Sequence, residues 1–164
     1  MGTAPLSRRE LLTGRTAAKP VRIRPPGASE ASLAACTGCG LCTERCPTGI
    51  IRLLDGLPFV DFARGECTFC GACEAACPEP VFVAEDVQRF PHVAAITDTC
   101  LARRNVACQS CRETCPEQAI RFRPRIGGPF LPEINEARCT GCGACLGGCP
   151  VSAIAVKVTE VTHV

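Results

Sequence analysis

Residues 36–47 read Cys36-Thr37-Gly38-Cys39-Gly40-Leu41-Cys42-Thr43-Glu44-Arg45-Cys46-Pro47, a compact run of four cysteines that ends in Cys-Pro. The same spacing returns at residues 67–78 and 139–150, and a longer version of it lies at residues 100–116. Runs of this kind supply the ligands of [4Fe–4S] clusters, and the fourth cysteine typically binds the neighbouring cluster. The four repeats therefore predict four [4Fe–4S] clusters.

Disulfides and zinc are the competing interpretations of sixteen cysteines in 164 residues. Disulfide pairing is disfavoured because cysteines separated by two residues in a tight loop direct their sulfurs toward a common centre. Structural zinc sites usually combine two separated Cys-x2-Cys pairs, with four ligands for each ion. Three cysteines followed by Cys-Pro suit a cubic cluster better, because three sulfurs cover one face and the fourth comes from another segment.

The motifs form two pairs along the chain, and the crossed rule assigns ligands within each pair. Three cysteines of one motif are then completed by the last cysteine of its partner. The expected ligand sets are Cys36, Cys39, Cys42 and Cys77 for cluster 1; Cys67, Cys70, Cys73 and Cys46 for cluster 2; Cys100, Cys108, Cys111 and Cys149 for cluster 3; and Cys139, Cys142, Cys145 and Cys115 for cluster 4.

The segments between paired motifs are similar in length and pattern. Residues 50–60 contain two apolar runs around Asp55-Gly56, which predicts a hairpin, and the alternation of Ile120 and Phe122 with arginines predicts a strand with one solvated face. Further strands are expected at 81–83 and 153–156, and helical turns at 43–45 and 74–76. The predicted class is α+β, a tandem pair of bacterial two-cluster ferredoxin-like modules.

The expected organisation has five segments. These are a disordered head at 1–30, a first module at 31–84, a connector at 85–99, a second module at 100–158 and a tail at 159–164. Within the connector, residues 93–96 are expected to pack back against a module. Seven apolar residues are expected to keep water from the clusters: Ile50, Ile51, Phe59, Phe62, Phe82, Ile120 and Ile154.

Several functional classes are disfavoured by composition. Residues 1–30 contain no apolar region of a secretory signal, and no stretch approaches the roughly 20 apolar residues of a membrane span, so we expect a cytoplasmic protein. The chain has no Tyr or Trp and its arginines are scattered, which disfavours nucleic acid as a partner. No nucleophile–base set, paired carboxylates or phosphate loop is visible, so we do not expect an enzyme.

The third motif departs from the others because seven residues, Leu101 to Ala107, separate Cys100 from Cys108. This insertion contains Arg103 and Arg104. Positive charge near a cluster would raise its reduction potential. A tolerated loop insertion without electrochemical purpose explains the same residues equally well.

The segment Ser7-Arg8-Arg9-Glu10-Leu11-Leu12-Thr13-Gly14-Arg15, the long third motif and the ending Cys149-Pro150-Val151-Ser152-Ala153-Ile154 together closely resemble the NapF family. These are ferredoxin-type accessory proteins of the bacterial periplasmic nitrate reductase system, and the resemblance covers essentially the whole chain. It implies a cytoplasmic protein with four [4Fe–4S] clusters that binds the catalytic subunit NapA, in its apo form, before export. Arg8 and Arg9 resemble a twin-arginine signal start, but no apolar region follows, so export is not expected.

Three functions are compatible with these features of the sequence. The resemblance favours a maturation factor that supplies NapA with electrons or cluster material. The alternative is a ferredoxin-type electron carrier between a donor and a reductase. A passive scaffold is disfavoured, because one cluster in each module would be enough to stabilise so small a fold.

Overall fold

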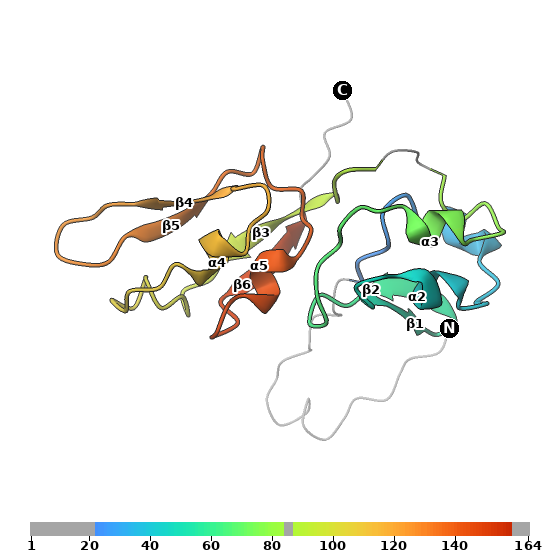
Figure 1. Cartoon of the computed structure of the whole chain (residues 1–164), viewed down its shortest axis with the longest axis horizontal. Helices are drawn as coiled ribbons and strands as arrows, with labels where there is room; N and C mark the ends of the chain where they lie inside the picture. Colours follow the sequence, from blue (N-terminus) through green and yellow to red (C-terminus); the bar gives the residue numbers. More distant parts are fainter. Residues whose placement is uncertain (1–21, 84–86, 159–164) are drawn as a thin grey trace, which may run out of the picture.

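The structure is a computed structural model that describes residues 22–83 and 87–158, in which short helices alternate with two-stranded ribbons (Figure 1). This confirms the predicted α+β class. Its elements in chain order are η1, a 3-10 helix (Ser32–Ala35), α2 (Leu41–Arg45), β1 (Ile51–Leu54), β2 (Leu57–Val60), α3 (Ala72–Ala75), β3 (His92–Ile96), α4 (Ser110–Glu113), β4 (Ile120–Arg123), β5 (Leu131–Ile134), α5 (Ala144–Gly147) and β6 (Ile154–Val158).

Each pair of motifs encloses an antiparallel hairpin, as predicted. In β1–β2, Ile51 lies opposite Val60, and the turn residues Asp55 and Gly56 have φ angles of 54° and 78°. Two positive φ angles in a two-residue loop match the right-handed twist of the strands, which explains the Asp-Gly pair. In β4–β5, Ile120 lies opposite Ile134, and the arginines of β4 face solvent.

A third ribbon joins the two ends of the second unit. Strand β3 pairs antiparallel with β6, with Ile96 opposite Ile154. The structure here differs from the expected connector at 85–99, because β3 lies inside that range and belongs to the ribbon of the second unit. Val93 and Ala94 are buried in the core of that unit, so burial of these apolar residues explains the difference. In the described part of the first unit, a single bridge between Ala28 and Phe82 lies at the corresponding place, where a strand was expected at 81–83.

Residues 22–30, which were expected in the disordered head, lie against the first unit. The carbonyl of Ile23 accepts a hydrogen bond from the N–H of Val60 at 2.8 Å, and Arg24 donates to the carbonyl of Pro58 at 3.0 Å. Arg24 also pairs with Glu30 at 2.7 Å. Ile23 and Arg24 thus provide hydrogen-bond partners for backbone groups at the free edge of β2. The sequence pattern did not indicate this contact. Arg8 and Arg9 lie outside the described residues.

Each unit has its own apolar core. Buried Ile50, Ile51 and Phe62 form the first, and Ile120 and Ile154 contribute to the second, as expected, whereas Phe59 and Phe82 are half-buried. Figure 1 shows the units side by side, with α5 and β6 on the side of the second unit that faces the first. Within residues 22–83 and 87–158, no helix has the length and apolar character needed to cross a membrane.

Candidate iron–sulfur centres

The cysteines gather around four pockets, and each pocket takes three cysteines from one motif and one from its partner. We number the pockets after the motif that contributes three. They contain Cys36, Cys39, Cys42 and Cys77 (pocket 1); Cys67, Cys70, Cys73 and Cys46 (pocket 2); Cys100, Cys108, Cys111 and Cys149 (pocket 3); and Cys139, Cys142, Cys145 and Cys115 (pocket 4). None of these pockets contains all four cysteines of a single motif.

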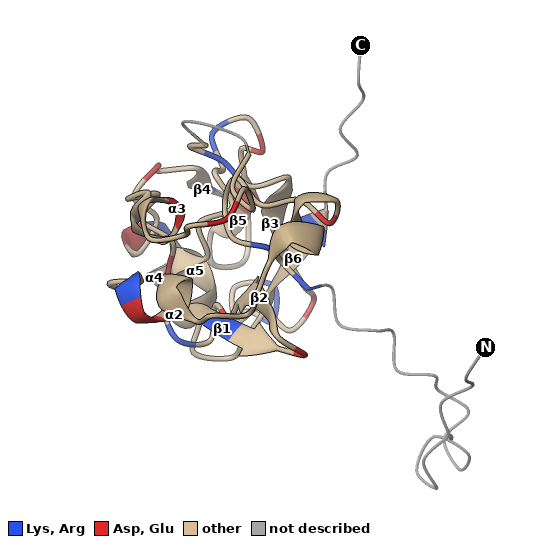
Figure 2. Ribbon diagram, turned by 90° about the vertical axis from the view of Figure 1, so that its right-hand side faces the viewer, with Lys and Arg blue, Asp and Glu red and all other residues tan. Residues whose placement is uncertain are grey.

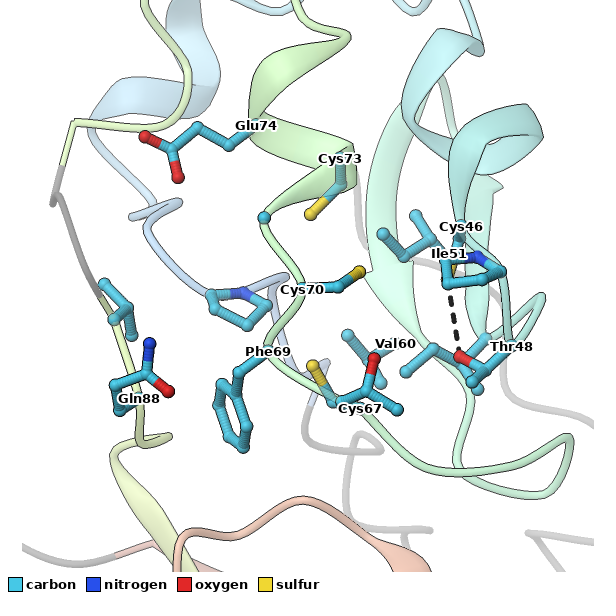
Figure 3. A pocket seen from close by; sticks show the side chains of 16 residues that line it. Cys46, Thr48, Ile51, Val60, Cys67, Phe69, Cys70, Cys73, Glu74 and Gln88 are labelled. Carbon is cyan, nitrogen blue, oxygen red and sulfur yellow. Dashed lines mark hydrogen bonds between the residues drawn. The ribbon is translucent and has the colours of Figure 1, made fainter.

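Pocket 2 illustrates how separate segments meet. Figure 3 shows Cys73 on α3, Cys67 and Cys70 on the loop that leads into α3, and Cys46 on the segment that follows α2. The hydroxyl of Thr48 lies 3.5 Å from the sulfur of Cys46. Four sulfurs therefore surround one space although the residues come from both halves of the first unit.

A short helix places the third cysteine of every motif. Helices α2, α3 and α5 begin after a glycine in the left-handed region, for example Gly71 at φ 71° and Gly143 at φ 90°. This conformation reverses the chain between the second and third cysteine and is one that residues with a Cβ rarely adopt. Helix α4 instead begins after Gln109 at φ −133°, so the third motif enters its helix differently.

A recurring turn aims a backbone N–H at the fourth cysteine. The N–H of Ala119 lies 3.3 Å from the sulfur of Cys115, and the N–H of Ala153 lies 3.1 Å from the sulfur of Cys149. In each case the preceding residue, Gln118 or Ser152, has a positive φ, of 48° and 49°. The left-handed residue turns the chain back, so that the next N–H stabilises a thiolate.

Burial makes several thiolates in the pockets costly without a cation. Burial, followed by repulsion from neighbouring thiolates, raises the pKa of Cys145 to about 12 and is also the main cause that raises the pKa of Cys73 and of Cys111 to about 11. Cys46 is different: burial would raise its pKa, but the hydrogen bonds from Thr48 and from the N–H groups of Ile50 and Ile51 outweigh it and lower the pKa.

This chemistry fits a [4Fe–4S] cluster. An iron–sulfur core supplies the positive charge that four clustered thiolates require, and it accepts hydrogen bonds at sulfur. Thr140 is consistent with such an acceptor, since its hydroxyl is buried in pocket 4, is near the thiol of Cys142, and has no oxygen or nitrogen partner among the described residues. In the part of the chain that the structure describes, no three His, Cys, Asp or Glu side chains are grouped so as to hold a single metal ion.

The two arginines of the insertion in the third motif lie outside pocket 3. Arg103 pairs with Asp98 at 2.8 Å, and Arg104 donates to the carbonyl of Asp98 at 3.3 Å. The pocket lining includes Leu101 but neither arginine. Neither arginine therefore contacts pocket 3, so no direct contact supports the expected rise in the reduction potential of its cluster. Among the described residues, basic and acidic side chains are interspersed in the view of Figure 2.

The structure also shows contacts that sequence patterning missed. His92 falls within the range expected as a connector, but it is buried, its Nε2 donates to the carbonyl of Gly141 at 2.9 Å, and its ring stacks on Phe90. Arg89 donates to the carbonyls of Glu136, Ala137 and Cys139 at 2.6 to 3.2 Å. No local signal could have indicated these bonds, because each joins residues far apart in the chain.

Comparison with known proteins agrees with the cysteine pattern. Residues 35–82 and residues 106–153 each match a family of 4Fe-4S dicluster domains. The chain is 46% identical over 140 residues to the ferredoxin-type protein NapF of Haemophilus influenzae, which covers 84% of this chain and 80% of that protein. It is 42% identical over 154 residues to NapF of Escherichia coli K12, covering 92% of this chain and 94% of the relative.

A more distant relative belongs to another system. The methylamine utilization ferredoxin-type protein MauM of Methylobacillus flagellatus is 32% identical over 172 residues, which covers 90% of this chain and 72% of that protein. The two dicluster matches, together with sixteen cysteines, give four [4Fe–4S] clusters in the chain.

Proposed function

Since the chain belongs to the NapF family of ferredoxin-type iron–sulfur proteins, we propose that it acts in the cytoplasm on the catalytic subunit of periplasmic nitrate reductase, NapA, before that subunit is exported. It assists maturation of apo-NapA by supplying electrons or by assembling its cluster. It is an accessory protein rather than an enzyme. The observation that carries this proposal is the similarity to NapF, which extends over both cluster-binding units.

The proposal includes a ligand assignment. Each pocket holds one [4Fe–4S] cluster, so that clusters 1 to 4 occupy pockets 1 to 4 with crossed ligands. The grouping of cysteines, the N–H groups aimed at Cys115 and Cys149, and the high cost of uncompensated thiolates at Cys73, Cys111 and Cys145 support this assignment. The clusters supply one-electron redox chemistry, while the protein positions them and keeps water out.

A second candidate is a general ferredoxin-type electron carrier. The similarity to MauM favours it, because a chain of the same type is named there for methylamine utilization. This function requires rapid reduction by a donor and no preference for an immature partner. The two candidate functions therefore require the same clusters but predict different binding partners.

An anaerobic pull-down separates the two candidates. The reconstituted protein, with about sixteen irons per chain, is offered apo-NapA and cofactor-loaded NapA at equal concentration, and the iron-free chain serves as the matched control. Preferential capture of apo-NapA by the iron-loaded chain supports the maturation role. Equal capture of both forms, or capture of neither, contradicts it and leaves the electron carrier.

A further inference from the structure

The two units touch through the cysteine segments themselves. The backbone N–H of Cys67, in pocket 2, donates to the carbonyl of Cys142, in pocket 4, at 2.8 Å. We propose that this contact is an electron-transfer junction and that the four clusters form a single path in the order 1, 2, 4, 3. The proposal depends on the ligand assignment given under the proposed function.

Further bonds hold the junction in place. The N–H of Phe90 donates to the carbonyl of Thr140 at 2.9 Å, close to the start of the fourth motif. Residues that bind the two inner clusters are therefore direct neighbours in space.

Apolar side chains exclude water around the contact. Phe62 of the first unit lies edge-on to both Phe90 and His92, with ring centroids 5.8 Å apart in each pair. Leu146, on α5 of the second unit, packs against the cores of both units. A dry and rigid contact keeps the distance between the inner clusters constant and lowers the dielectric between them.

Short covalent segments link the other neighbours. Cys42 and Cys46 lie at the two ends of one helical segment and belong to pockets 1 and 2. Cys111 and Cys115 likewise connect pockets 3 and 4. Among the residues that the structure describes, no backbone hydrogen bond joins segment 36–42 to the second unit or segment 100–111 to the first. Pockets 1 and 3 are thus the ends of the path.

The transfer step moves one electron and nothing else. A reduced cluster on one side of the junction is oxidised, its oxidised neighbour is reduced, and no bond or proton changes. An external one-electron donor of low potential loads the path. Pocket 4 is an internal relay, because two of its cysteines are buried and none is exposed.

Two full-length double variants test the order. Cys42→Ala with Cys111→Ala removes a ligand from each outer cluster, whereas Cys73→Ala with Cys145→Ala removes the equivalent ligand from each inner cluster. All four positions are the third cysteine of a motif and lie on a short helix, so the variants are matched. Each is expected to retain about eight irons. Both are reduced with photoreduced deazaflavin and examined by electron paramagnetic resonance.

We expect the variant with only inner clusters to show signals broadened by spin–spin interaction, and the variant with only outer clusters to show two narrow, independent signals. Broadening in the outer-only variant, or its absence in the inner-only variant, overturns the order. Iron contents that do not fall by about half contradict the ligand assignment instead, so failure of the proposed sites is recognised separately.

A second measurement uses the intact iron-loaded chain. In hydrogen exchange followed by mass spectrometry, the amides of Cys67 and Phe90 are expected to be protected. Phe62→Ala should speed their exchange without changing that of the Thr97 amide, which donates to the carbonyl of Ala153 within the second unit at 2.9 Å. Exchange of the Cys67 amide at the rate of an unprotected amide in the wild-type chain overturns the junction.

Discussion

Phe62 lies so close to Gly143 that no side chain fits between them: a Cβ added at residue 143 would be 2.1 Å from Cδ1 of Phe62. Phe62 lies two residues after the end of β2, and Gly143 immediately precedes α5 in the second unit. One glycine thus serves two purposes, the tight turn between cysteines of motif four and the close approach of the two units.

Gly143→Ala tests this dual role. We expect loss of more than the roughly 1–2 kcal/mol that a left-handed residue with a Cβ costs, because overpacking adds about 1–3 kcal/mol. Gly71→Ala is the matched control, since Gly71 has the same place in motif two, a φ of 71° and nothing within 4 Å of an added Cβ. Iron loss to a chelator and the free energy of unfolding measure the difference. Equal effects of the two substitutions would contradict the contact, and Phe62→Ala should partly rescue Gly143→Ala.

Ser152→Gly should stabilise the second unit. Ser152 has a φ of 49° immediately before the N–H that lies against the sulfur of Cys149. Glycine adopts this conformation without steric cost, so we expect a gain of up to about 1 kcal/mol in the free energy of unfolding. Ala155→Gly, in strand β6, is expected to do the opposite by about 0.5–1 kcal/mol. Chemical denaturation of the iron-loaded chain measures both, and a loss on Ser152→Gly would contradict the role of the turn.

Thr48→Val should lower the reduction potential of cluster 2. The hydroxyl of Thr48 lies 3.5 Å from the sulfur of Cys46, and a hydrogen bond to a ligand sulfur stabilises the more negative, reduced cluster. Thr43→Val is the control, because the Thr43 hydroxyl donates to the carbonyl of Gly40 and not to a sulfur. A redox titration followed by electron paramagnetic resonance should shift for the first variant only. An unchanged potential would show that the hydroxyl does not act on the cluster.

His92 should make stability depend on pH. Burial lowers its pKa below the ordinary value of 6.5, and the hydrogen bond to Gly141 only partly opposes this. The unfolded chain therefore binds the proton more readily, so the stabilisation is present above about pH 6.5 and is lost as the pH falls from there toward the folded-state pKa. We expect His92→Gln to flatten the slope of unfolding free energy just below about pH 6.5. An unchanged slope would assign the pH dependence to other groups.

The cysteine repeats and the hairpins could be read from the residues because they are local. Cys-x2-Cys-x2-Cys spacing constrains the chain within a single turn and helix, and Asp55-Gly56 selects its hairpin within four residues of the strands. The four pockets contain the sets that the crossed rule pairs, and that pairing follows from the repeat alone. The pairing of β3 with β6 could not be read in this way, because β3 carries no strong local signal in a stretch that begins with Pro91 and His92.

The residues alone were sufficient for the number and type of clusters and for the α+β class, since these depend on ligand chemistry and short-range periodicity. The fold was needed to place β3 beside β6, to bury His92 and to bring Cys67 against Cys142. Those contacts join residues that are distant in the chain, and their formation depends on how two apolar cores pack once each unit has formed. No pattern within a single segment encodes that packing, which is why the order of the clusters becomes visible only in three dimensions.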